Sequence, residues 1–272
     1  MKPTDQIDCS LVITTYNSPD VLDLALLSAL AQSEFPCEII VADDGSTIDT
    51  ANLVEAHRVA SGIPIVHVWQ DDKGYRLSAS RNRAIAAAKG NYIVLVDGDV
   101  LMHRDFIKDH IRSALQGTFI QGSRVWLTKE NTSMRLTSRD IVVSMFEKGL
   151  ENRKNALHFP FLSRLFALKN SSLNGIRGCN MSFFRNDCIL VNGFNEDFTG
   201  WGREDSEFVV RLINSGVFRR NVRFSAIVSH LWHPENQRYS LTENDRLLQQ
   251  AIDGKFTTCR NGIDKYLVKK YL

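Results

Sequence analysis

Four short apolar segments alternate with helix-forming segments over residues 10–96, and this alternation constrains the fold more than any other feature of the chain. The apolar segments, whose length and composition are typical of buried strands, are 10–15, 38–42, 65–70 and 92–96. The helix-like segments between them are 21–32, 49–61 and 78–89. This order predicts an α/β fold with a mixed, mainly parallel, Rossmann-like sheet flanked by helices.

Polar residues follow three of the predicted strands at the point where each strand ends. Thr14 and Tyr16 stand at the end of the first strand, Asp44 follows the second, and Asp97 and Asp99 follow the fourth. In an open α/β sheet the carboxyl ends of the strands surround one crevice, in which ligands bind. We therefore expect these side chains to converge on one site.

The D-G-D sequence at 97–99 is the first candidate for a metal site. Gly98 allows a tight turn, so both carboxylates can face one point. Two hard oxygen ligands suit Mg²⁺ or Mn²⁺, with substrate phosphates supplying further ligands. Taken alone, the three residues favour a solvated turn, and the rest of the chain is what shifts the interpretation to a metal site.

The alternation of strand-like and helix-like segments is less regular in the second half of the chain. Its predicted elements are a helix at 104–115, strands at 119–127, 176–184 and 222–228, a helix at 204–214 and a helical tail from 241. Residues 129–174 mix charged residues with apolar clusters, and we interpret them as helical and packed on the far half of the sheet.

The sequence G-W-G-R-E-D at 200–205 precedes one of these helices. Glu204 and Asp205 lie in its first turn, where the helix dipole favours carboxylates, and this alone can explain them. Trp201 and Gly202 are costly there unless a flexible loop and a large ring are needed. A mobile tryptophan loop beside a carboxylate suits closure over a sugar, with the acid as general base.

Two further pairs of residues are candidates for ligand contacts. His230 and His233 follow a predicted strand, and imidazole is a ready ligand for a divalent transition ion. Arg76 and Arg81 flank the start of the helix at 78–89, where cations and a helix N-terminus together suit a diphosphate. Ordinary core or surface positions are the alternative for each of these residues.

Net charge, cysteine content and apolar content indicate which kinds of partner and location to expect for the protein. The 272 residues carry a net charge of +2, which gives no bulk field for nucleic acid. The five cysteines are scattered without C-x-x-C spacing, as expected in a reducing cytosol. Neither a signal core nor an apolar stretch of about 20 residues is present. We expect a cytoplasmic protein with at most peripheral contact with the inner membrane surface, for which Lys265, Lys269 and Lys270 in the tail are one candidate.

Taken in order, these segments resemble the inverting nucleotide-sugar glycosyltransferases of family two, which have the GT-A fold. In the first half the resemblance rests on L-V-I-T-T-Y-N, I-I-V-A-D-D-G-S-T, S-A-S-R-N-R-A-I and V-L-V-D-G-D. In the second half, R-G-C-N-M-S-F and G-F-N-E-D-F-T-G-W-G-R-E-D-S-E-F resemble the C-terminal galactosyltransferase-type module of β-1,4-galactosyltransferases, polypeptide GalNAc-transferases and bacterial chondroitin-type polymerases. The resemblance covers residues 9–235 and is weakest over 129–174.

The resemblance implies one domain in four parts. These are a nucleotide-sugar donor-binding half at 1–127, a variable helical insertion at 128–174, an acceptor-binding and catalytic half at 175–240, and a helical tail at 241–272. In the first part, Thr14 and Tyr16 would line the nucleoside pocket and Asp44 would hydrogen-bond the uracil ring. Further donor contacts would come from Arg76, Arg81, Gly98, Gly178 and Asn180.

The resemblance also implies the metal site and the catalytic group. Asp97 and Asp99 would hold Mn²⁺ or Mg²⁺ on the diphosphate, Asp99 the more directly. His233 matches the metal-binding histidine of these relatives, and His230 falls where galactosyltransferases have a methionine ligand. The remaining roles are Asp205 as general base, Glu204 on sugar hydroxyls, and Trp201 with Gly202 in the loop that closes over the substrates.

The expected activity is transfer of a hexose or N-acetylhexosamine from a UDP-sugar to a glycan or glycolipid, in bacterial surface polysaccharide or lipopolysaccharide synthesis. Gal and GalNAc are favoured, although Arg203, where galactosyltransferases have glycine, leaves the sugar open. A nucleotidyltransferase or dehydrogenase would need a Gly-rich loop after the first strand, which 11–17 lacks. A phospho-receiver module would leave the second half unexplained. A non-catalytic sugar-nucleotide-binding protein of the same fold remains the alternative.

Overall fold

The computed structural model describes residues 6–234 and 238–267, and its main sheet has the strand order β3-β2-β1-β4-β10-β6-β11-β9. Four strands pair in parallel: β1 (Cys9–Thr15), β2 (Glu38–Asp43), β3 (Ile65–Trp69) and β4 (Tyr92–Asp97). They are connected by α1 (Pro19–Leu30), α2 (Ile48–Ala60) and α3 (Leu77–Ala87). The predicted mainly parallel α/β sheet is confirmed.

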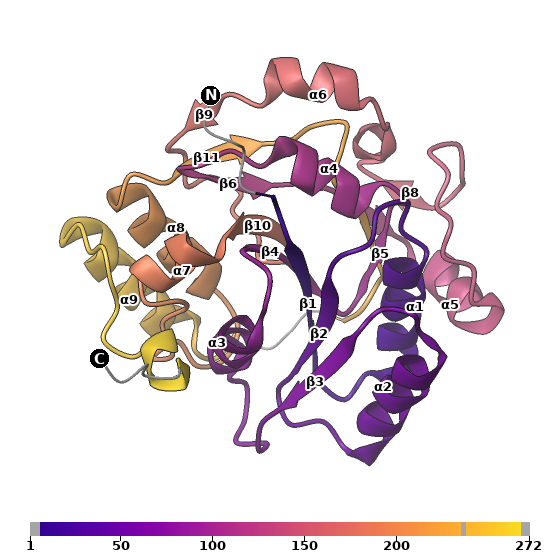
Figure 1. Ribbon diagram of the computed structural model, residues 1–272, viewed down its shortest axis with the longest axis horizontal. Helices are drawn as coiled ribbons and strands as arrows, with labels where there is room; N and C mark the ends of the chain where they lie inside the picture. The colour runs from indigo at the N-terminus through magenta and orange to yellow at the C-terminus, as the bar shows by residue number, and fades with distance from the viewer. Residues whose placement is uncertain (1–5, 235–237, 268–272) are drawn as a thin grey trace.

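Alternate residues of β1 pack on opposite faces of the sheet, as the two-residue period of a strand requires. Leu11 and Ile13 belong to a core that α1 completes with Leu22. Val12 belongs to a second core, to which α3 contributes Ala84. Helices therefore cover both faces of the sheet (Figure 1).

The other half of the main sheet reverses direction at β10 (Asn180–Phe184), which runs antiparallel to β4. The strand predicted at 176–184 is thus confirmed only from Asn180 onward. The outer strands are β6 (Thr118–Gln121), β11 (Phe218–Asn221) and β9 (Lys169–Asn170). Because β10 opposes β4, Asn180 lies beside Val96, and the segment before β10 begins next to the D-G-D turn.

A second sheet, of order β5-β12-β7-β8, places a histidine beside the same turn. Its strands are β5 (Val100–Met102), β12 (Ile227–His230), β7 (Ser123–Leu127) and β8 (Leu150–Glu151). Since β12 runs antiparallel to β5, His230 lies opposite Val100, directly after Asp99. Two parts of the chain that are far apart in sequence therefore meet at the carboxyl end of β4.

The prediction of one continuous strand at 119–127 is wrong. The segment divides at Gly122 into β6 and β7, which belong to different sheets. A Cβ atom at Gly122 would lie 2.4 Å from Asn180 Nδ2, so the chain turns where only glycine fits against that side chain.

The prediction of a strand at 222–228 is wrong over most of its length. Residues 222–226 connect β11 to β12, and only the last two residues of the predicted range lie in β12. Phe224 and Ala226 have positive φ angles of 61° and 49°, which an extended strand does not allow.

The remaining described helices surround the two sheets (Figure 1). They are α4 (Phe106–Ser113), α5 (Lys129–Ser138), η1 (Arg153–Ala156), α6 (Pro160–Phe166), α7 (Arg185–Leu190), α8 (Glu204–Asn214), α9 (Leu241–Asp253) and η2 (Ile263–Tyr266). Among them, α4 and α8 contribute side chains to the two cores. The helical interpretation of 128–174 is only partly right, because β8, β9 and a non-helical stretch at 139–149 interrupt the helices. None of the described helices has the length and apolar content of a membrane span.

Candidate active site

Three possible metal ligands meet at the carboxyl end of β4. Asp99 Oδ1 lies 3.4 Å from His230 Nε2, and Asp99 Oδ2 lies 3.3 Å from His233 Nε2. One ligand atom from each residue lies within 4.8 Å of the other two. The structure thus brings together three of the four predicted metal ligands, and their role in binding a metal stays a prediction.

Backbone contacts orient both imidazole rings of this group. His230 Nδ1 lies 2.8 Å from the Leu231 carbonyl oxygen, and His233 Nδ1 lies 2.7 Å from the Pro234 carbonyl oxygen. A carbonyl oxygen only accepts, so each Nδ1 carries a proton and each Nε2 lone pair in a neutral ring faces Asp99.

The donor set fits a divalent cation. Burial by itself raises the pKa of Asp99, but the His230 and His233 imidazoles hold that pKa below its ordinary value. Asp99 Oδ1 is buried and has no hydrogen-bond partner. The hydrogen bond to Asp99 raises the pKa of His233 to about 9, so this ring holds a proton toward Asp99 when no ion is bound. Once that proton is lost, a carboxylate and two Nε2 lone pairs converge, which is the environment that a transition ion such as Mn²⁺ would satisfy.

The fourth predicted ligand, Asp97, faces another partner. Its Oδ1 accepts a hydrogen bond from Thr14 Oγ1 at 3.1 Å and pairs with Arg81 Nη2 at 3.2 Å. Asp97 is therefore not part of the group formed by Asp99 and the histidines, and its predicted metal contact has no support in this geometry. Gly98 between them is needed for close approach, because a Cβ there would lie 2.5 Å from the Thr14 carbonyl oxygen.

A second group of possible metal ligands lies elsewhere, formed by His103, Asp105 and His158. Asp105 accepts a hydrogen bond from Ser33 Oγ at 2.5 Å. His103 Nδ1 accepts a hydrogen bond from the Asp105 amide. These hydrogen bonds occupy atoms that a metal ion would need, so this second group is less suited to bind one.

Arg81 connects the D-G-D turn to the first turn of α8. Its guanidinium is buried and pairs with Asp97 and, at 3.0 Å through Nη1, with Glu204 Oε1. Arg81 is thus enclosed by carboxylates, and its predicted contact with a diphosphate stays a prediction. A Cβ at Gly178 would lie 2.6 Å from Arg81 Nη2, so this position must be glycine if Arg81 is to keep its place.

Glu204, which is buried, and Asp205, which is partly buried, form a carboxylate pair at the start of α8. Burial and the neighbouring Asp205 raise the pKa of Glu204 to about 7. Burial also raises the pKa of Asp205, although Arg81 and hydrogen bonds from Ser206 and Gly178 oppose the shift. The Gly178 amide donates to Asp205 Oδ2 at 2.9 Å, which orients this carboxylate. A carboxylate with a raised pKa is the type of group that acts as a general base near neutral pH.

The loop before α8 has the backbone conformation that its glycines predict. Gly200 and Gly202 have φ angles of 70° and 105°. Trp201 is partly exposed, with the Arg238 guanidinium 5.3 Å from its ring centroid. Asn244 on α9 donates to the Gly202 carbonyl oxygen at 2.9 Å, so α9 helps to position the loop.

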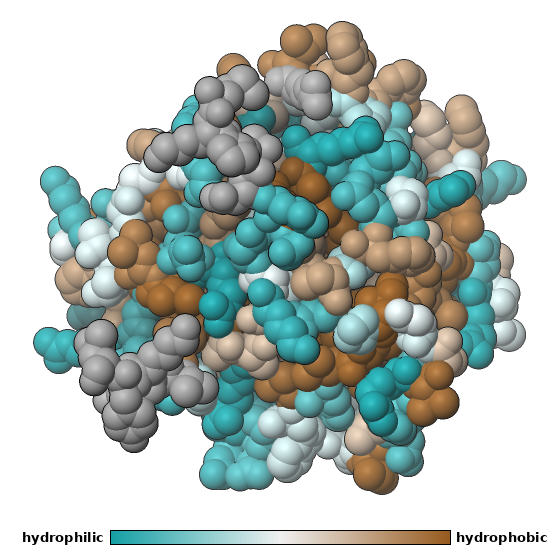
Figure 2. Space-filling model, viewed as in Figure 1, coloured by the Kyte–Doolittle hydropathy of each residue, from teal (hydrophilic) through white to brown (hydrophobic). Residues whose placement is uncertain are grey.

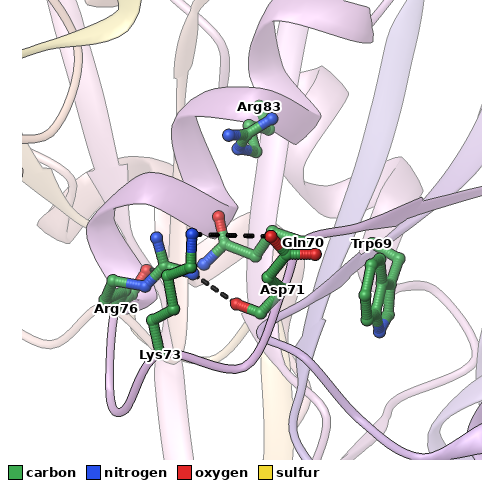
Figure 3. Close-up of a pocket in the computed structure, with 6 residues that line it drawn as sticks. All are labelled: Trp69, Gln70, Asp71, Lys73, Arg76 and Arg83. Atoms are coloured by element: carbon green, nitrogen blue, oxygen red, sulfur yellow. Dashed lines mark hydrogen bonds and ion pairs between the residues drawn. The ribbon is translucent and has the colours of Figure 1, made fainter.

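The predicted nucleoside pocket lies at the ends of β2 and β3. Asp44 is buried and accepts hydrogen bonds from Gln70 Nε2 at 2.5 Å and from the Arg76 amide at 2.7 Å. Figure 3 shows an adjacent pocket, in which Arg76 and Lys73 reach Asp71 and Trp69 lies on the opposite side. The residues that line this pocket are Trp69, Gln70, Asp71, Lys73, Arg76 and Arg83.

Gln70 was not among the predicted site residues. Its Oε1 is buried and unpaired, which leaves an acceptor beside Asp44. The signal was present in the sequence, because Gln70 ends the third apolar segment and Asp44 stands just beyond the second.

Of three other predicted contact residues, Tyr16 is accessible, whereas Thr14 and Asn180 are buried. Tyr16 is half-exposed and donates to Asp72 Oδ2 at 3.0 Å, so it remains accessible to a ligand. Thr14 is buried with its hydroxyl on Asp97. The Asn180 side chain is buried and donates to the Ser123 and Ala226 carbonyl oxygens, so its predicted contact with a donor sugar stays a prediction.

Comparison with known protein families identifies the chain. A family model described as glycosyl transferase family 2 matches residues 10–185, which is more than half of the chain. The chain belongs to glycosyl transferase family 2. A second model, described as the N-terminal domain of galactosyltransferase, matches residues 164–234. The resemblance inferred from the sequence motifs is therefore confirmed for both halves.

Curated relatives of this family 2 chain are longer proteins. It is 29% identical over 269 residues to chondroitin synthase from Escherichia coli, covering 89% of this chain and 38% of the relative. It is 23% identical over 272 residues to cholesterol galactosyltransferase from Borreliella burgdorferi, covering 96% of this chain and 73% of the relative. The chain thus spans well under half of the chondroitin synthase that it matches.

Solved structures show the same fold. The mannosyltransferase PcManGT from Pyrobaculum calidifontis, in complex with GDP-Man and Mn²⁺, has a TM-score of 0.60 at 18% identity, covering 93% of this chain and 65% of that chain. TarS 1-349 from Staphylococcus aureus, in complex with UDP, has a TM-score of 0.61 at 18% identity, covering 92% and 65%. The predicted GT-A architecture is confirmed.

Proposed function

We propose that this family 2 chain is an inverting glycosyltransferase that moves a hexose or N-acetylhexosamine from a UDP-sugar to a glycan or glycolipid. The observation that supports this most is the continuous network from the metal-ligand group to the carboxylate pair. Asp99 lies two residues from Asp97, which pairs with Arg81, and Arg81 pairs with Glu204 beside Asp205. The proposed glycosyl transfer needs a metal ion at the leaving diphosphate and a base at the attacking hydroxyl, and the two must lie close together.

The proposed chemistry is one displacement. Asp205 accepts the proton of the acceptor hydroxyl while that oxygen attacks the anomeric carbon from the face opposite UDP, and the configuration inverts. Asp99, His233 and His230 would hold Mn²⁺ or Mg²⁺, which supplies positive charge for the leaving diphosphate. Arg81 keeps Glu204 in place, and Glu204 is the group proposed to bind sugar hydroxyls.

The donor proposal rests on the pocket beyond β2 and β3. Asp44 and the unpaired Gln70 Oε1 offer acceptors to a ring N–H, as the uracil of UDP would require. The match to the galactosyltransferase model and the likeness to a cholesterol galactosyltransferase support Gal or GalNAc as the sugar. The likeness to chondroitin synthase supports a role in polysaccharide synthesis, which we place in the bacterial cytoplasm.

A screen of UDP release tests this proposal against a non-catalytic sugar-nucleotide-binding protein. We expect slow UDP release from one of UDP-Gal, UDP-GalNAc, UDP-Glc and UDP-GlcNAc in the presence of Mn²⁺ and without acceptor, because water can replace the hydroxyl. Binding of UDP with no release from any of the four donors, with or without a glycan acceptor, would favour the binding protein instead.

We further propose that α6 makes peripheral contact with anionic lipid. Phe161 and Leu165 on α6 are 80% and 64% exposed, and apolar side chains follow this helix along the top of the molecule (Figure 2). Residues 152–186 contain six Lys or Arg and no Asp or Glu. An exposed apolar helix within a basic segment is the combination that binds an anionic membrane surface.

Vesicle sedimentation tests the lipid contact. We expect binding to vesicles that contain phosphatidylglycerol, and a loss of about tenfold or more in the Phe161→Ser, Leu165→Ser double variant, since each change removes a large buried apolar area from the bound state. The matched control is Val59→Ser on α2, which is 76% exposed. Equal binding of the double variant and the control would rule out α6 as the contact.

A further inference from the structure

Two arginines beside the proposed active site lack a charged partner. Arg124 on β7 and Arg177, just before Gly178, make no ion pair with any residue that the structure describes. Three fully buried arginines that the structure describes do otherwise: Arg81 pairs with Asp97 and Glu204, Arg135 with Glu147, and Arg211 with Glu207. Other buried or half-buried arginines, such as Arg219, are held by backbone carbonyl oxygens instead, and the guanidiniums of Arg124 and Arg177 have neither kind of partner among the described residues.

The contacts of Arg124 are weak ones for a guanidinium. It stacks 4.1 Å from the centroid of the Trp126 ring, and its Nη1 reaches Cys179 Sγ at 3.3 Å. Its Nε is buried without a hydrogen-bond partner. A thiol sulfur is a poor acceptor, so most of the hydrogen-bonding capacity of Arg124 is unused.

Arg177 is half-buried and repelled by its neighbour. Its backbone is fixed by Gln121, whose Oε1 accepts from the Arg177 amide at 3.1 Å, whereas no described residue bonds its guanidinium. Burial and the charge of Arg124 lower the pKa of Arg177. Arg219 lies on the far side, but its guanidinium is occupied by the backbone carbonyl oxygens of residues 172, 174 and 175. Like charges held together without a carboxylate are relieved by an anion.

Arg124 and Arg177 lie near both the proposed metal ligands and the carboxylate pair of α8. The Trp126 ring on which Arg124 stacks lies 4.3 Å from the His230 ring, and His230 faces Asp99. Arg177 precedes Gly178, whose amide orients Asp205. A ligand held by Arg177 would thus lie next to the group proposed to take the acceptor proton.

We propose that Arg124 and Arg177 form an oxyanion subsite for the acceptor, so that the acceptor carries a carboxylate or phosphate near its reacting hydroxyl. The inference rests on the proposed function, because it assigns these arginines to the acceptor of that reaction. The planar fork of a guanidinium matches either oxyanion through two parallel hydrogen bonds. A uronic acid and a sugar phosphate are the two sources of this chemistry.

Calorimetry on the full chain, saturated with UDP and Mn²⁺, tests the subsite. The probes are methyl β-glucuronide, glucose 1-phosphate and the neutral methyl β-glucoside. We expect one of the two anions to bind at least about tenfold more tightly than the glucoside, as charge-assisted hydrogen bonds predict. A preference for the glucuronide identifies a carboxylate, and a preference for the sugar phosphate identifies a phosphate. No preference for either anion overturns the proposal.

Variants separate this subsite from the donor site. We expect Arg177→Gln and Arg124→Gln each to reduce the anion affinity to that of the glucoside and to change UDP affinity by less than about twofold, whereas the exposed Arg223→Gln changes neither. A loss of UDP affinity in the first two variants would assign the arginines to the donor and overturn the proposal. The anion titrations are also carried out without UDP, so the anion preference is measured even if UDP does not bind. A failure of UDP to bind would count against the proposed function and not against the subsite.

Discussion

Asp205→Asn is expected to lower turnover by about 10²- to 10⁴-fold, the contribution typical of a positioned general base. The amide keeps the size of the side chain and can still accept from the Gly178 amide, but it cannot take the proton of the acceptor hydroxyl. The affinity for UDP should stay within about twofold, since Asp205 is not among the proposed metal ligands. Turnover of UDP-sugar with acceptor and calorimetry of UDP are the two measurements.

The control for this substitution is Asp197→Asn. Asp197 is an exposed acid of the same region that bonds Asn261 Nδ2 at 2.9 Å and contacts neither Arg81 nor Gly178. It should leave turnover and UDP affinity unchanged. Unchanged turnover in Asp205→Asn would remove this residue as the base.

Asp99→Ala is expected to abolish the Mn²⁺-dependent part of UDP binding. The substitution removes the carboxylate that both His230 Nε2 and His233 Nε2 face, and two neutral imidazoles without it are a weak site for a hard divalent ion. Calorimetry of UDP with Mn²⁺ and with chelator gives the result: the wild-type protein should show a clear difference between the two conditions, and the variant should show none.

The matched control is Asp105→Ala in the second group of possible metal ligands. It removes a carboxylate beside His103 and His158 and should leave the Mn²⁺ dependence of UDP binding intact. If Asp105→Ala removed that dependence and Asp99→Ala did not, the metal would belong to the second group, and the proposed site would be wrong.

Local patterns were sufficient to predict the first half of the fold. The apolar segments that became β1 to β4, and the polar residues that follow them, are set by neighbours in sequence, and right-handed crossovers place their carboxyl ends at one edge. The same rule would have identified Gln70 at the end of β3. The D-G-D turn and the first turn of α8 could also be predicted, because short sequences define them.

The second half depends on contacts that no local pattern contains. Residues 119–127 look like one strand, yet their division between two sheets depends on Asn180 packing against Gly122. The positive φ angles of Phe224 and Ala226 could not be predicted, because neither residue is a glycine or asparagine. Sheet order, unlike strand propensity, is decided by partners that are distant in sequence.

The burial of Arg81 could not be predicted for the same reason. Its position in the first turn of a predicted helix suggested an anion site, but Glu204, which is 123 residues away, and Asp97 enclose it. The structure therefore gives Arg81 a place between the two carboxylate groups that the sequence could only treat separately.

The most direct test of the proposed site is a crystal structure with UDP and Mn²⁺, in which anomalous scattering locates the ion. We expect one Mn²⁺ bound to Asp99 and His233 and to the diphosphate of UDP, with Asp205 lining the same cavity. An ion bound away from Asp99, or a diphosphate that lies out of reach of both Asp99 and Asp205, would contradict the proposed active site.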